Sequence, residues 1–119
     1  MSTIKVDTIK NTSNVEVFTC KAWVNFDGTT NTGGSCTIRA SGNVTSVTDN
    51  GTGDYTVNFT NAMTDVNYSS LFTNGMLNTN FWGPETKIYA QLTGSVRIRS
   101  VQNTGAFTDA DSCNVAVFR

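Results

Sequence analysis

The stretch SVTDNGTGDYTVNFTNAM, residues 46–63, decides the fold, because its pattern predicts two strands joined by a corner. Its centre, DNGTGD, holds two glycines among Asp, Asn and Thr, residues that accept the positive φ angles of tight turns. After the corner, Tyr55, Val57 and Phe59 alternate with polar residues, which is the two-residue period of a half-buried strand. The sequence therefore predicts a β-hairpin at this point.

Two ligand-binding interpretations compete with the corner. The polar side chains from Asp49 to Asp54 are oxygen donors that suit calcium, but they lack the EF-hand order and no downstream glutamate completes the shell. A phosphate-binding loop needs a helix to begin after it, whereas residues 55–59 favour a strand. We therefore expect no metal site and no cofactor, and a corner that shapes the fold.

The composition predicts an all-β domain. The 119 residues suit a single domain, and they include 20 Thr, 14 Asn and 10 Gly but only 1 Pro. Charged residues make up 14% of the chain, against roughly 25% in an ordinary soluble domain. Thr and Val favour strands, and Asn and Gly favour turns, so little of the sequence favours helices.

The charge and hydropathy patterns argue against two kinds of partner, nucleic acid and the membrane interior. A formal net charge of −1 with scattered Lys and Arg offers no basic footprint for nucleic acid. No apolar run approaches the roughly 18 residues of a membrane span, so we expect no membrane insertion. The segment MSTIK is not followed by the apolar core of a signal peptide. We expect the protein to be made in a cytoplasm.

The chain offers few groups for catalysis. It has no histidine, so neither a Ser-His-Asp device nor a His-containing metal site can form. Paired carboxylates are the remaining acid–base option, and the candidates are Asp109 with Asp111 or Asp49 with Asp54. Both pairs stand in segments that suit turns. We therefore expect binding or structure, and no enzyme.

The three cysteines show no C-x-x-C pairing, and their odd number leaves at least one unpaired. Neither a zinc site nor a complete disulfide framework is indicated. We expect reduced thiols, with Cys20 and Cys36 acting as small apolar residues in strands.

The N-terminal segment predicts an extended arm over residues 1–14. Apolar and polar residues alternate from Thr3 to Ile9, and the polar run after them breaks the pattern. Such an arm often lies on a neighbouring molecule, so Ile4, Val6 and Ile9 are the candidate contacts with a larger assembly or with another subunit.

Residues 15–119 are expected to form the β-domain, and its longest strand candidate is VEVFTCKAWVNF, residues 15–26. Both of its faces carry apolar groups, which predicts that a second sheet or another subunit covers each face. Trp23 is expected in the core. Further alternating segments bring the total to seven or eight short strands, which favours a jelly-roll-like antiparallel β-sandwich. These segments are residues 36–40, 66–72, 86–92, 95–101 and 113–118.

The segment from Thr73 to Pro84 is long for a hairpin connection and carries two aromatic residues. Phe81 and Trp82 could stack on a sugar, with Asn80 beside them, or they could fold back and plug the end of the sandwich. Arg97 and Arg99 alternate on one strand face. They could hold an anionic ligand, but such a pair more often forms a solvent face or an intersubunit ion-pair row.

Three segments carry a resemblance to a known family. They are AWVNFDG (residues 22–28), TIRASGNV (37–44) and TDNGTGDYTVNF (48–59), and the ends MSTIKVDTI (1–9) and VAVFR (115–119) fit the same pattern. Together they resemble a module of bacteriophage tail-fibre and other virion-surface proteins, notably from phages of marine and cyanobacterial hosts. The chain departs from that pattern in a longer loop over residues 29–35 and in Gly42, where an aromatic residue is common.

The resemblance implies a β-rich module displayed on the virion surface, usually as a homotrimer. The first hypothesis is therefore a non-enzymatic virion structural protein for host attachment, with itself, other virion proteins and host-surface carbohydrate as partners. The alternative is a capsid decoration protein of the knob or cement type. A third hypothesis, from a different class, is a carbohydrate-active enzyme domain that uses aspartates.

Overall fold

The computed structural model describes residues 3, 5–76 and 85–119, and they form an all-β fold. The described residues contain eight strands and no helix, so the predicted all-β class and strand number are confirmed. The strands are β1 (Cys20–Thr32), β2 (Ser35–Gly42), β3 (Val44–Gly51), β4 (Asp54–Phe59), β5 (Ser69–Gly75), β6 (Glu85–Gln91), β7 (Ser95–Val101) and β8 (Ser112–Phe118).

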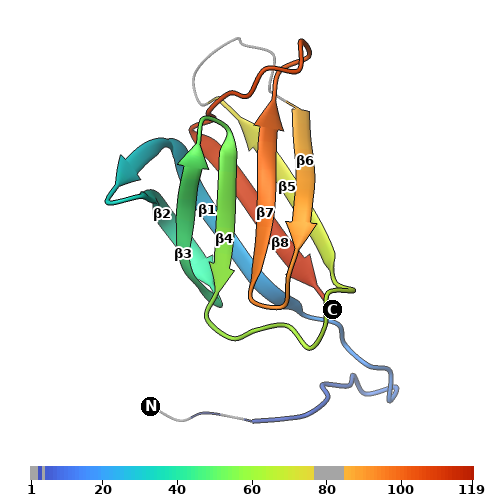
Figure 1. Cartoon of the computed structure of the whole chain (residues 1–119). Helices are drawn as coiled ribbons and strands as arrows, with labels where there is room; N and C mark the ends of the chain where they lie inside the picture. The colour runs from blue at the N-terminus through green and yellow to red at the C-terminus, as the bar shows by residue number, and fades with distance from the viewer. Residues whose placement is uncertain (1–2, 4, 77–84) are drawn as a thin grey trace.

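All strands pair antiparallel in one sheet of order β5-β8-β1-β2-β3-β4-β7-β6. The sheet curls so that its edge strands β5 and β6 lie next to each other, which gives a nearly closed, barrel-like shape. Figure 1 shows β3, β4, β7 and β6 as a layer in front of β1, β8 and β5. A sandwich of two separate sheets is not confirmed, because β2 and β3 are joined through the pair Ser35 and Thr48.

The space between the two layers holds the core. Its largest fully buried side chains include Tyr55, Phe26 and Ile98. The rings of Phe26 and Tyr55 meet edge to face, with centroids 5.2 Å apart and an interplanar angle of 73°. Burying one such apolar side chain contributes about 1.5–3 kcal/mol. The alternation predicted from Tyr55 to Phe59 is confirmed, because Tyr55, Val57 and Phe59 are all buried.

The prediction that Trp23 belongs to the core is wrong. Strand β1 begins at Cys20 and directs Ala22, Val24 and Phe26 inward, so the residues between them point outward. Trp23 is 45% exposed. Within one chain, therefore, only one face of β1 is covered.

The corner predicted at DNGTGD joins β3 to β4 and is confirmed as a hairpin, with Val47 opposite Val57. Gly53 has φ +63, and a Cβ there would lie 2.5 Å from the carbonyl oxygen of Ser100. Its N–H donates to Asp109 Oδ1 at 2.7 Å, and the same oxygen accepts the hydroxyl of Tyr55 at 2.9 Å. The corner is thus attached to the segment that leads into β8.

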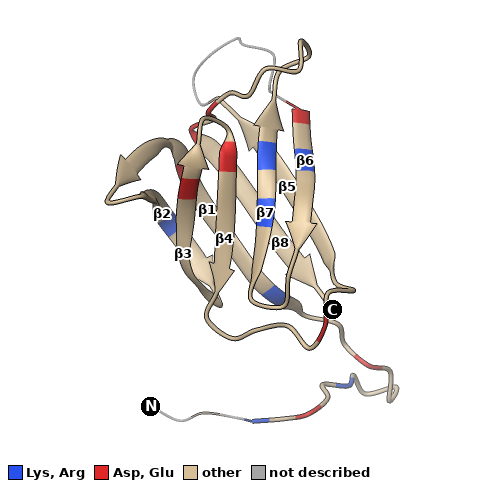
Figure 2. Cartoon of the chain, viewed as in Figure 1, with Lys and Arg blue, Asp and Glu red and all other residues tan. Residues whose placement is uncertain are grey.

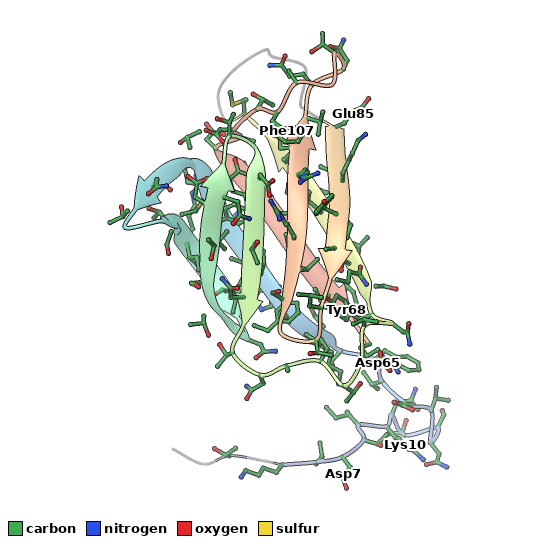
Figure 3. All side chains as sticks on the ribbon, viewed as in Figure 1. Asp7, Lys10, Asp65, Tyr68, Glu85 and Phe107 are labelled. Carbon is green, nitrogen blue, oxygen red and sulfur yellow. The ribbon has the colours of Figure 1, made fainter. Side chains whose placement is uncertain are left out.

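The described part of the N-terminal arm is exposed and leaves the barrel at the end where the C-terminus lies (Figure 1). It folds on itself, since the N–H of Val17 donates to the carbonyl of Ile9 at 2.6 Å and Lys10 pairs with Glu16. Figure 3 shows Asp7 and Lys10 well away from the sheet.

Candidate binding surfaces

Asp54, the first residue of β4, is the centre of a charged cluster on the outer side of the front layer. It is only 6% exposed. Arg97 donates to both of its carboxylate oxygens, from Nε and Nη2, at 2.8 Å each. Arg99 Nε donates to Oδ2 at 3.2 Å, and Asn50 Nδ2 donates to Oδ1 at 3.3 Å. Charge-assisted, bidentate hydrogen bonds of this kind are among the strongest hydrogen bonds in proteins.

Hydrogen bonding within the cluster shifts the pKa values of Asp54 and Arg97. The hydrogen bond from Arg97 is the largest influence on Asp54, and it holds the pKa of that carboxyl below its usual value although burial opposes it. The same bond raises the pKa of Arg97. One carboxylate therefore faces two guanidinium groups, and the cluster carries a net positive charge.

Two exposed aromatic rings lie against Arg99. Its Cζ is 3.4 Å from the centroid of Tyr89 and 5.2 Å from that of Phe107. Tyr89 is also 5.2 Å from Arg97 Cζ, and the register between β6 and β7 shifts beside it, between Ile88 and Ala90. Guanidinium groups stack on aromatic faces in this range. We call the surface formed by Asp54, Tyr89, Arg97, Arg99 and Phe107 the arginine face.

Further charge surrounds the arginine face. Lys87 on β6 is the direct cross-strand partner of Arg99, so both side chains leave the same side of the sheet. Figure 2 shows the blue segments of β6 and β7 side by side, with an acidic residue at the start of each of β4 and β6. The residue on β6 is Glu85, which lies at the same end of the molecule as Phe107 (Figure 3). With both carboxylates counted, the three cations leave this region positive.

A row of hydroxyl and amide groups continues from the arginine face across β4 and β3. Thr56 lies opposite Arg97 and accepts a hydrogen bond from Asn50 Nδ2 at 2.7 Å. Asn58 Nδ2 donates to Ser46 Oγ at 3.1 Å and to Thr48 Oγ1 at 2.9 Å. These groups extend the polar surface from Arg97 across β4 and β3.

The outer side of the rear layer carries an apolar row. Leu71 on β5 lies opposite Ala116 on β8, and Ala116 lies opposite Trp23 on β1. Leu71 is 56% exposed, and Phe118, two residues beyond Ala116 on the same side of β8, is 40% exposed. We call the surface formed by Trp23, Leu71, Ala116 and Phe118 the tryptophan face.

The other half of the rear layer is polar. Asn25 donates from Nδ2 to Asn114 Oδ1 at 2.5 Å and accepts from Arg39 at 3.3 Å. Arg39 also donates to the carbonyl of Asp111 at 2.5 Å and lies 3.6 Å from a carboxylate oxygen of Asp27. On the outer side of the rear layer, the apolar residues of β1, β5 and β8 thus gather in the tryptophan face.

The acidic candidates serve the fold. Asp109 accepts the two hydrogen bonds that attach the corner, and Asp111 supplies its carbonyl to Arg39. Asp49 accepts from the N–H of Gly51 at 3.0 Å and from Asn31 at 2.9 Å. Within residues 3, 5–76 and 85–119, no three acidic or cysteine side chains form a group that could hold a metal ion.

The described cysteines form no disulfide. Cys20 is exposed, whereas Cys36 and Cys113 are buried. Burial raises the pKa of each of these two thiols to about 12.

The structure describes only some of the residues that were predicted to contact other molecules. Asn80, Phe81, Trp82 and Ile4 lie outside the described residues. Val6 and Ile9 are 57% and 50% exposed, so both are accessible to another molecule.

The arginine face is only partly visible in the sequence. The spacing of Arg97 and Arg99 indicates an anion site or a solvent face, but reasoning from the sequence misses Tyr89 and Phe107. The sequence does hold a signal for Tyr89. The predicted strand that contains it is followed directly by the strand that carries both arginines, and the two strands are neighbours in the sheet.

No model of a known protein family, no curated protein and no solved structure matches this chain. In the part of the chain that the structure describes, no helix is long and apolar enough to cross a membrane.

Proposed function

We propose that the chain is a non-enzymatic bacteriophage virion structural protein, a trimeric surface or fibre-type module for host attachment. The three segments that resemble such modules fall on β1, on β2 and on the β3–β4 hairpin, which are consecutive neighbours in the sheet. The resemblance thus covers a contiguous structural unit. We further propose that the two layers of each subunit behave as the two sheets of a sandwich.

The tryptophan face is the observation that supports the proposed trimer. Trp23 and Leu71 are 45% and 56% exposed, and both flank Ala116 on a regular part of the sheet. A contiguous exposed apolar patch on a soluble protein commonly marks a contact surface. In a closed threefold assembly every subunit buries the same residues, so three copies of the chain with their tryptophan faces turned toward the symmetry axis would cover this patch.

The arm supports attachment to the particle. Val6 and Ile9 expose apolar side chains, and the arm's turn is held within the arm by hydrogen bonds to Asn11 Oδ1. Such a segment can lie on another virion protein while the barrel remains displayed. The same feature favours the second candidate, a capsid decoration protein, which differs from the first only in its location on the virion.

The oligomer is tested by the solution mass of the purified protein, measured by light scattering. We expect three times the mass of one chain, and the same assembly for a variant that lacks residues 1–12. Leu71→Lys should give monomers, because it places a charge in the tryptophan face. Leu92→Lys is the matched control, since Leu92 is 60% exposed outside that face.

A monomeric wild-type protein, or a trimer that survives Leu71→Lys, would contradict the trimer on this face. The place on the virion is tested by immunogold labelling of intact particles with antibodies to the protein. Label on the tail supports the fibre-type module, label on the capsid supports the decoration protein, and unlabelled particles would overturn both.

A further inference from the structure

We propose that the arginine face binds the carboxylate groups of an acidic polysaccharide. The inference rests on the proposed attachment role, and it names the ligand class and the residues that would recognise it. Arg99 and Lys87 hold the anionic group, while Tyr89 and Phe107 hold the sugar ring.

The donors for an anion are in place on Arg99. Arg97 uses Nε and Nη2 on Asp54, whereas Arg99 uses only Nε, at the longer distance of 3.2 Å. Among the described residues, the two terminal nitrogens of Arg99 donate no hydrogen bond. Stacking on Tyr89 fixes the plane of the guanidinium, and a planar donor pair suits a carboxylate.

The aromatic rings suit the sugar itself. Tyr89 and Phe107 are 55% and 47% exposed although each lies beside Arg99. Both rings offer an apolar face to the C–H groups of a sugar, and the hydroxyl of Tyr89 adds a hydrogen-bonding group at the rim of its ring. The hydroxyl and amide row of Ser46, Thr48, Thr56 and Asn58 extends the surface in the direction that a longer chain of sugars would take.

An internal ion pair, a neutral sugar or a nucleic acid would each use less of the arginine face. An internal ion pair accounts for Arg97, but it requires neither the terminal nitrogens of Arg99 nor two exposed rings. A neutral sugar would use the rings but not Lys87. Nucleic acid depends on many phosphate contacts, and three cations beside two carboxylates on a chain of net charge −1 give little attraction.

The test uses tetragalacturonate, which carries a carboxylate on each sugar, and a neutral galactose tetramer of the same length. Binding to the full chain is followed by isothermal titration and by amide NMR shifts at low salt. We expect tetragalacturonate to bind, to move the signals of Lys87, Tyr89 and Arg99, and to bind more weakly as salt rises. The neutral tetramer should bind at least about tenfold more weakly.

Arg99→Gln should weaken tetragalacturonate binding at least about tenfold, because it removes the positive charge and the planar guanidinium donor pair while Arg97 still pairs with Asp54. Lys87→Gln provides a second variant on an exposed side chain in case the first does not fold. Arg119→Gln is the matched control. It removes the same charge from another arginine paired with a carboxylate, that of Asp65, at the opposite end of the molecule, and it should leave binding unchanged.

Three outcomes would overturn the inference. The first is equal binding of the acidic and neutral tetramers, and the second is equal binding by the wild type, Arg99→Gln and Lys87→Gln. The third is a preference for a single-stranded oligonucleotide, which would point to general anion binding. In each case, trimers and labelled particles would still support the proposed virion role, so the two failures are distinguishable.

Discussion

Arg97 donates two hydrogen bonds of 2.8 Å to Asp54, although the direct cross-strand partner of Asp54 is Arg99. The stronger contact therefore runs along the diagonal of the β4–β7 ladder, which long side chains can span. Arg99 reaches the same carboxylate only through Nε, and within the described residues its two terminal nitrogens donate no hydrogen bond. This arrangement joins a stabilising ion pair to a candidate binding group.

Changing Asp54→Asn should lower stability at neutral pH by about 1–3 kcal/mol, because two arginines lose a charged acceptor. It should also flatten the acid limb of the pH–stability profile, which is the part where the free energy of unfolding decreases as pH falls. The folded pKa of Asp54 is lowered, so its contribution is complete above the unfolded value of about 3.9 and is lost as pH falls through the folded value. Urea unfolding between pH 7 and pH 2 measures both effects.

The control for this change is Asp65→Asn. Arg119 lowers the pKa of Asp65 to about 2, but this pair is exposed to solvent and screened, so the substitution should alter stability at pH 7 much less than Asp54→Asn does. A wild-type acid limb that persists unchanged in Asp54→Asn would show that the cluster does not contribute to folding.

Gly53→Ala should destabilise the fold by more than about 2 kcal/mol, since the new Cβ would meet the backbone of Ser100 and Thr108 at a positive φ. Gly105→Ala separates the steric clash of the new Cβ from the backbone strain of a positive φ. Gly105 has φ +87 but nothing within 4 Å of its Cβ position, so only the backbone strain of about 1–2 kcal/mol applies. Equal midpoints in thermal unfolding would contradict the close packing at the corner.

Tyr55→Phe should cost about 1–3 kcal/mol, because the fully buried hydroxyl donates to Asp109 and lies 3.0 Å from the carbonyl oxygen of Gly28. Tyr89→Phe makes the same change on an exposed ring and should shift stability by less than about 0.5 kcal/mol. Chemical denaturation of both variants provides the comparison, and similar losses would indicate that the Asp109 contact is weak.

The sequence predicted the parts of this fold that depend on local pattern. Alternation identified all of β7 and β4 except its first residue, Asp54, and the glycines marked the corner between β3 and β4. Alternation also divides β1 into two faces, but it does not say which face the rest of the chain covers. Trp23 and Val24 are both large and apolar, and only the curl of the sheet places Val24 inside and Trp23 outside.

The candidate site was less predictable for a similar reason. Asp54 and Arg97 are separated by 43 residues, and their contact depends on the register of β4 against β7. That register follows from backbone pairing, which a single sequence does not specify. Phe107 precedes β8 in a segment without regular structure, so its position beside Arg99 had no periodic signal.

The thiols provide a test of burial that is independent of stability. The thiolate is the reactive form, and burial raises the pKa of Cys36 and Cys113 to about 12, whereas Cys20 is exposed. A disulfide reagent at pH 8 should therefore modify one thiol per native chain and all three in denaturant. Cys20→Ser should abolish the native reaction, while Cys36→Ser should leave it intact. Rapid native modification of Cys36 or Cys113 would show that the barrel opens at β2 or β8, the strands that carry these two residues.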